Sequence, residues 1–312
     1  MSDTVVTTAS GAWAVAAALM LGAAALGAAS LDGVLTARST GGSARGGARM
    51  ALAETARLMR QRRRTTVSAD TLLWRIGGGG LLVAALLMIV VVPFGSWTLA
   101  DLAVGVVWFN AMDVLVWALV WLSGWGANSA YALVGAYRFL AHALAYELPL
   151  MFALTAPAVA ASSLRVADVA AAQDDVWFVV WMPVAFAVYC LGIVAFSVWG
   201  PFAPATGADV AGGVLVEASG VDRLLVLAGR YALLAAGAAF ATPMFLGGGA
   251  GPLLPDWAWV LVKALVLLGG LVAVRRRLPA IRPDRFVEVG WLVLLPAVLL
   301  QVLVVSVIVV RS

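Results

Sequence analysis

The chain has 312 residues, of which 63% are hydrophobic and 12% are charged, and its mean hydropathy is +1.02. Soluble domains usually have about 45 to 50% apolar residues, so this composition excludes a water-soluble globular protein and indicates an integral membrane protein. With one cysteine, Cys190, and one histidine, His142, the chain by itself offers no disulfide framework, no cysteine-ligated iron–sulfur cluster and no metal site.

Hydropathy predicts an all-α, polytopic membrane protein in which residues 1–312 form a single membrane domain. Each apolar stretch is near or above the ~18 residues that a membrane helix needs. The stretch nearest the amino terminus is predicted to be a retained helix, because no Lys or Arg precedes it as in a signal peptide. The eight predicted spans are residues 11–31, 76–94, 102–123, 138–161, 176–199, 224–247, 257–274 and 288–310.

The loop after the first span is strongly basic. Residues 32–75 contain nine arginines. Within the loop, Met50, Leu52, Leu58 and Met59 alternate with charged residues, which predicts a short amphipathic helix at the membrane interface. The arginines themselves are typical of a loop that stays on the cytoplasmic side.

Charge distribution predicts the orientation in the membrane. The loops 32–75, 124–138, 200–223 and 275–287 hold sixteen of the twenty basic residues. Because Lys and Arg are enriched in cytoplasmic loops, these four loops are predicted to face the cytoplasm and both termini to lie outside. The expected location is therefore the cell inner (cytoplasmic) membrane.

Two carboxylates fall inside predicted spans. Glu147 lies near the middle of 138–161, and Asp113 lies in 102–123. An acidic side chain at the centre of a membrane helix costs roughly 2.5 to 3.5 kcal/mol, so it normally faces a bundle interior or wet cavity and marks an ion path. For Asp113, a position nearer the interface, or a pair with Arg230, is an open alternative.

Pro149 and Pro157 each remove a backbone donor, which predicts a kinked helix with freed carbonyls near Glu147.

Three other ionisable residues could belong to the same path. Arg230 and Lys263 lie within spans and are natural partners for the two carboxylates. His142 lies five residues before Glu147, about 140° around an ideal helix, so the two side chains are not expected to touch. The glycine-rich runs at 77–80 and 247–251 lack the residues of a phosphate loop, and no nucleotide or nucleic-acid partner is expected.

Several ordered motifs resemble one family. They are GWGANSAYALVGAYR at 124–138, AYELPL at 145–150, DVAAAQ at 168–173, FLGG at 245–248, and RRRLPAIRPDRFVEVGWLVLLP at 275–296. Together they resemble the H subunit of NADH-quinone oxidoreductase, a membrane subunit of complex I, whose family includes the matching subunit of membrane-bound hydrogenases.

The resemblance implies a subunit that does no redox chemistry itself and has no catalytic residue of its own. It implies partners in the other membrane and peripheral subunits and in the lipid bilayer. It further implies that the chain forms the floor of a quinone site and the start of a proton path, with quinone at the interface with the peripheral arm. The proton path would comprise Glu147, Asp113, Glu217, Arg230, Lys263 and His142. The quinone and peripheral-arm interface would comprise Arg38, Asp209, Glu217, Arg282 and Asp284.

The segment 201–220 departs from the family pattern. Pro201, Phe202, Glu217, Ser219 and Gly220 match it. In the family, this acidic loop lines the route from the quinone cavity to the proton path, but here Asp209 and Glu217 are its only acids. The departure predicts weak proton transfer by this route. Two alternatives remain: the membrane anchor of a membrane-bound [NiFe] hydrogenase or formate hydrogenlyase, and a stand-alone secondary ion transporter.

Overall fold

The computed structural model describes residues 6–208, 211–275 and 277–311, and within them eight helices are long and apolar enough to cross a membrane. This confirms the predicted all-α membrane fold and its number of spans. The spanning elements are α1 (Trp13–Ser39), α3 (Thr71–Ile89), α4 (Gly105–Gly126), α5 (Ala130–Ala160), α8 with η1 (Pro183–Phe196 and Gly200–Thr206), α9 (Gly220–Phe245), α10 (Asp256–Val274), and α11, η2 and α12 in succession (Pro283–Val289, Gly290–Leu294 and Leu295–Arg311).

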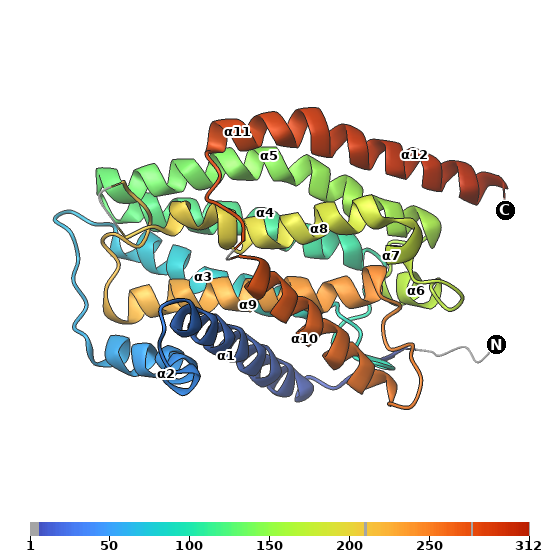
Figure 1. The fold of residues 1–312 in the computed structure, drawn as a ribbon, viewed down its shortest axis with the longest axis horizontal. Coiled ribbons are helices and arrows are strands. Elements are labelled where there is room, and N and C mark those ends of the chain that lie inside the picture. Colours follow the sequence, from blue (N-terminus) through green and yellow to red (C-terminus); the bar gives the residue numbers. More distant parts are fainter. Residues whose placement is uncertain (1–5, 209–210, 276, 312) are drawn as a thin grey trace.

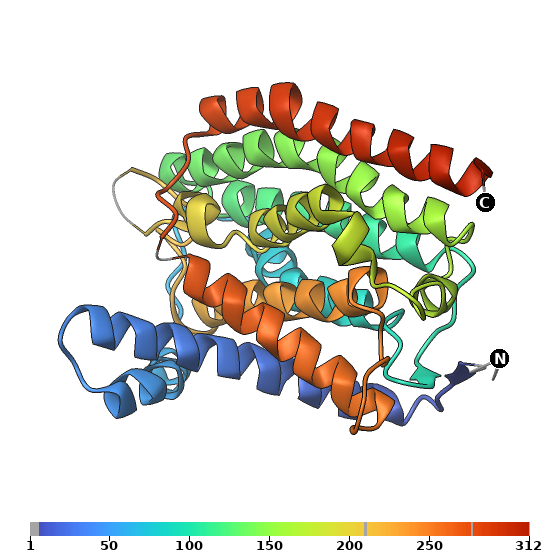
Figure 2. The ribbon, with the colours of Figure 1, turned by 45° about the vertical axis from the view of Figure 1, so that its right-hand side comes forward.

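The helices form a bundle whose centre is built from α5, α8 and α9 (Figure 1). Along the bundle, α3 packs against α4 and α9, α4 against α5, and α5 against α8. The last helix, α12, covers α5 at one edge, while α1 and α10 lie against α9 at the other (Figure 2). The edge helices α1 and α12 are the least buried spans, so they present most of their surface to the surroundings.

Both described ends of the chain lie at the same end of the bundle (Figure 1). We call this end the terminal face; it also carries the connections 90–104, 161–182 and 246–255, and the short elements β1 (Thr7–Thr8), β2 (Trp97–Thr98), α6 (Val166–Ala171) and α7 (Phe178–Trp181). We call the opposite end the arginine face. Its connections lie at 40–70, 127–129, 197–219 and 275–282.

Several spans begin or end away from their predicted positions. The span predicted at 11–31 continues to Ser39, because the charge of Asp32 is met by Arg275, whose Nη1 lies 2.6 Å from Asp32 Oδ2. The span predicted at 176–199 is divided: α7 ends at Trp181, and α8 begins at Pro183 after a non-helical Met182. A residue before proline is disfavoured in the α-helical conformation, which accounts for the break.

The predicted helix in the first loop is α2 (Ala44–Arg60). It crosses α1 where two glycines meet: a Cβ on Gly33 would overlap the Gly47 carbonyl oxygen, and one on Gly47 would lie 2.5 Å from the Gly33 carbonyl oxygen. On the polar side, Arg57 donates two hydrogen bonds to Glu54 and thereby lowers the pKa of that carboxyl. Backbone contact thus fixes α2 against the end of α1, and its polar side stays charged at neutral pH.

The long helix α5 continues through both of its prolines, at Pro149 and Pro157. Pro149 has no N–H to donate to the carbonyl oxygen of Ala145, four residues earlier. The short π-helical turn η2 begins beside this carbonyl, since a Cβ on Gly290 would lie 2.5 Å from the Ala145 oxygen. The Ala145 carbonyl oxygen, which Pro149 leaves without its helical N–H donor, is therefore in close contact with the last span.

Candidate functional site

A pair of buried carboxyl groups lies between α4 and α5. Asn110 and Asp113 are three residues apart on α4, so they share one side of that helix, while Tyr146 and Glu147 are adjacent on α5. Asn110 Nδ2 donates to Glu147 Oε1 at 3.0 Å, and the Tyr146 hydroxyl donates to Asp113 Oδ1 at 3.3 Å. These two contacts bring one carboxyl group from each helix to the interface between α4 and α5. We call these four residues the carboxyl pair site.

This site is enclosed within the bundle. Asp113 is fully buried, and Glu147 is only 8% exposed. The remaining oxygens, Asp113 Oδ2 and Glu147 Oε2, receive no hydrogen bond from an N–H or O–H donor among the described residues. Two acids are therefore held together without a basic partner in the part of the chain that the structure describes, an arrangement that can hold or release a proton.

The basic residues predicted as partners lie elsewhere. Lys263 Nζ donates to three carbonyl oxygens near the terminal face, those of Leu246 at 2.6 Å, Gly248 at 3.0 Å and Ala250 at 2.7 Å. The same ammonium lies 4.2 Å from the centre of the Trp177 ring. Lys263 is thus held by backbone and aromatic groups, and the structure does not pair it with Asp113 or Glu147.

Arg230 is also bound by a carbonyl. Its Nη2 donates to the Val198 oxygen, and its guanidinium lies 5.7 Å from the Trp199 ring centre. The centre of the same Trp199 ring lies 4.4 Å from the guanidinium carbon of Arg275. Arg275 in turn forms an ion pair with Asp32. The alternative pairing of Asp113 with Arg230 is therefore wrong: Arg230 belongs to a group near the arginine face, and Asp113 lies in the bundle interior.

His142 lies on α5 toward the arginine face from Glu147. Its ring is buried and packs edge-on against Phe202 at 5.0 Å and Phe286 at 5.8 Å between ring centres. Neither ring nitrogen has a side-chain partner among the described residues. The structure thus places the histidine in an aromatic contact with η1 and α11.

Glu217 lies at the arginine face, where it joins the segment 211–219 to the turn before α5. Ser129 Oγ donates to Glu217 Oε1 at 2.7 Å, and Arg138 Nη1 donates to the Gly212 carbonyl at 2.8 Å. The Glu217 side chain is only partly buried. Asp209, the other acid of this segment, lies outside the described residues.

The other residues predicted at the arginine face are exposed. Arg38 lies in the last turn of α1, and Arg282 donates two hydrogen bonds to Asp284 at 3.1 and 3.2 Å. These side chains are available to a partner that covers this face.

Sequence reasoning missed three members of the buried polar groups: Asn110, Tyr146 and Asp32. Asn110 carried a signal, because it precedes Asp113 by three residues and so had to share its side of a helix. Tyr146 and Asp32 carried none, since their roles depend on which other helix faces them.

Known proteins of one family are similar to this chain over most of its length. The family described as NADH dehydrogenase matches residues 15–306. An H subunit of NADH-quinone oxidoreductase in Geobacter sulfurreducens is 38% identical over 207 residues, which are 66% of this chain and 63% of that protein. Two similar proteins, also H subunits of NADH-quinone oxidoreductase, align more fully. The one in Rhodopseudomonas palustris is 32% identical over 83% of this chain and 82% of its own length, and the one in Cereibacter sphaeroides is 34% identical over 81% and 80%.

Proposed function

The chain is a multi-pass membrane protein that belongs to the family of the NADH-quinone oxidoreductase H subunit, and from that premise we propose that it couples electron transfer in a peripheral arm to ion movement through the bilayer. The matched region spans 63% of the length of the Geobacter relatives. The assignment of partners, quinone and ion translocation to this chain therefore belongs to the proposal.

The carboxyl pair site carries this proposal. In a low-dielectric interior, two negative charges repel each other strongly, so a pair of adjacent carboxyls is best accommodated when it holds one proton. A change of charge nearby can then shift that proton. The Tyr146 hydroxyl binds one oxygen of Asp113, and the Asn110 amide binds one oxygen of Glu147. The second oxygen of each acid remains available to exchange the proton.

We place the start of the path at the arginine face. Glu217 and Ser129 lie at this face. His142 is on the same helix as Glu147 and lies nearer to the arginine face than Glu147 does. Asp113 is the last group of the path, in the bundle interior. Arg38, Arg282 and Asp284 would contact the peripheral arm, and a quinone would bind between that arm and this face. Arg230 and Lys263 are assigned to structural contacts, because Arg230 Nη2 and the Lys263 ammonium donate to backbone carbonyl oxygens.

The proposal is tested by isolating the assembly that contains this chain. An affinity tag on the chain should recover peripheral subunits from detergent-solubilised membranes, together with NADH-dependent quinone reduction. Recovery of a nickel-containing subunit with hydrogen-dependent activity would assign the chain to the hydrogenase branch of the family. Recovery of the chain alone, with ion transport in liposomes, would contradict the proposal and support a stand-alone transporter.

We also propose that the arginine face is cytoplasmic and that both termini lie outside, because the basic residues of the loops concentrate at this face. Single cysteines can test this in a Cys190→Ala background. A membrane-impermeant maleimide should label Leu253→Cys in intact spheroplasts, since Leu253 is exposed at the terminal face. Thr65→Cys, exposed at the arginine face, should be labelled only after permeabilisation. The reverse pattern would invert the proposed orientation.

A further inference from the structure

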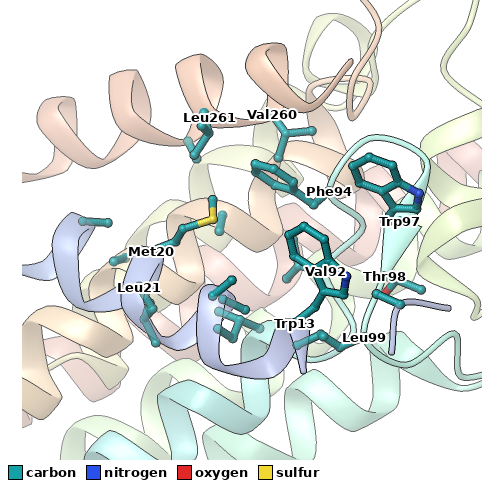
Figure 3. Close-up of a pocket in the computed structure, with 18 of the residues that line it drawn as sticks. Trp13, Met20, Leu21, Val92, Phe94, Trp97, Thr98, Leu99, Val260 and Leu261 are labelled. Carbon is teal, nitrogen blue, oxygen red and sulfur yellow. The ribbon is translucent and has the colours of Figure 1, made fainter. Parts of the chain in front are cut away.

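An apolar groove runs between α1 and α10 at the edge of the bundle. Near the terminal face it forms a cavity of about 460 Å³. Its walls include Trp13 and Met20 of α1, Leu261 and Leu265 of α10, and Phe94 and Trp97 of the connection before α4. Figure 3 shows the two indoles at one end of this cavity, and Met20 and Leu21 toward the other.

The groove extends beyond this cavity. A second cavity of about 410 Å³ continues between the same helices to Leu31 and Gly269. The two cavities share Met20, Ala24, Leu261, Leu265 and Leu268. From Trp13 to Leu31, at 1.5 Å per residue, the groove is about 27 Å long, close to the ~30 Å thickness of a bilayer core.

Alanines on one wall keep the groove open. Ala16, Ala17 and Ala24 of α1 face Leu261, Leu265 and Leu268 of α10, and alanines of α9 also line the cavity. Small residues in membrane helices usually allow a neighbouring helix to approach closely. In this groove the alanines leave an empty space, and the wall atoms around it lack the dispersion contacts that a neighbouring helix would provide.

The size of the groove decides between its two natural occupants. α1 and α10 contact each other beside the groove, so the groove is too narrow to admit a helix about 10 Å wide. A flexible hydrocarbon chain is thinner and can follow the groove.

Among the described residues that line the groove, those with polar side chains lie at one end. Thr7, Thr8 and Thr98 line the cavity at the terminal face, beside Trp13 and Trp97, whose rings stack at 6.3 Å with an interplanar angle of 21°. Tryptophan is enriched where a membrane meets water, at the level of the lipid headgroups. The groove is thus polar where a lipid has its glycerol and headgroup, and apolar where the lipid has its tail.

We propose that this groove is a phospholipid site. An acyl chain from the leaflet at the terminal face lies along Ala17, Met20 and Leu265, and the glycerol end lies beside Trp13 and Trp97. The lipid fills the part of the groove nearest the terminal face.

The test uses the assembly that contains this chain, reconstituted in nanodiscs with a phosphatidylethanolamine that carries a diazirine at the end of one acyl chain. After irradiation, adducts should map to peptides that contain residues 13–24 and 257–268. Ala17→Leu combined with Ala264→Leu fills the groove and should abolish these adducts. Ala14→Leu is the matched control, because Ala14 is exposed on the same helix and does not line the groove. Its adducts should match those of the unmodified chain.

Three results would overturn the proposal. One is equal labelling of the filled variant and the Ala14→Leu control. Another is loss of the lipid adducts when excess quinone is added, which would assign the groove to an isoprenoid tail. The third is efficient crosslinking of a photoreactive residue at position 17 to another protein subunit. If the double variant does not assemble, Ala17→Leu alone is compared with Ala14→Leu in the same way.

Discussion

Replacement of Glu147 by glutamine should lower ion translocation by about 100-fold, the size of effect expected when a positioned acid–base group is lost. Glutamine keeps the length of the side chain, and its carbonyl oxygen can still accept from Asn110 Nδ2. The amide cannot exchange a proton with Asp113. We therefore expect the complex to assemble, and electron transfer within the peripheral arm to fall much less than translocation. Both rates are measured in proteoliposomes, by fluorescence quenching of a pH dye and by quinone reduction.

The matched control for this variant is Glu288→Gln. It makes the same substitution at an exposed position on α11, where Glu288 accepts a hydrogen bond from Arg285. Translocation in the control should stay at the unmodified level, while Asp113→Asn should reproduce the loss seen in Glu147→Gln. Unchanged translocation in Glu147→Gln would make Glu147 a structural residue and remove the observation on which the proposed function depends.

Replacement of Lys263 by methionine should destabilise the protein by about 3 kcal/mol or more, because each buried polar group left without a partner costs about 1 to 3 kcal/mol. Three carbonyl oxygens lose their donor, and the contact with the Trp177 ring is lost as well. Methionine is similar in size and fits the apolar surroundings, so the effect reports the missing ammonium. A fall in the apparent Tm in detergent would show it.

Val266→Met is the control for this prediction. Val266 lies on the same helix with 70% of its surface exposed, so its replacement should leave the Tm nearly unchanged. The experiment also separates two roles for Lys263. Loss of stability with translocation retained per assembled complex supports the structural role. Normal stability with translocation lost would return Lys263 to the proton path.

Much of the architecture could be read from local patterns. Eight hydropathic stretches predicted eight spans, because a membrane helix satisfies its own backbone hydrogen bonds and needs only enough apolar residues in succession. The same reasoning identified Glu147 as a residue of interest, since an acid in an apolar run is conspicuous without knowledge of its neighbours. The ordered motifs at 124–150 indicated the family, which the match over residues 15–306 confirms.

Span limits were less predictable. Hydropathy reports which part of a helix lies in hydrocarbon, whereas the helix itself continues wherever its backbone and side chains find partners. Asp32 ended the predicted first span, but its contact with Arg275 lets α1 continue to Ser39. Only the tertiary structure brings together these residues, which are far apart in the sequence.

Composition, hydropathy and ordered motifs thus sufficed to predict the class of the protein, the number of its spans, its family and the presence of acids within apolar runs. The partners of those acids could not be predicted: Tyr146 donates to Asp113 and Asn110 to Glu147, while Arg230 and Lys263 are bound to backbone carbonyls. Hydropathy and charge are properties of single segments. Pairing depends on which sides of two helices face each other, and that is set by the packing of the whole bundle.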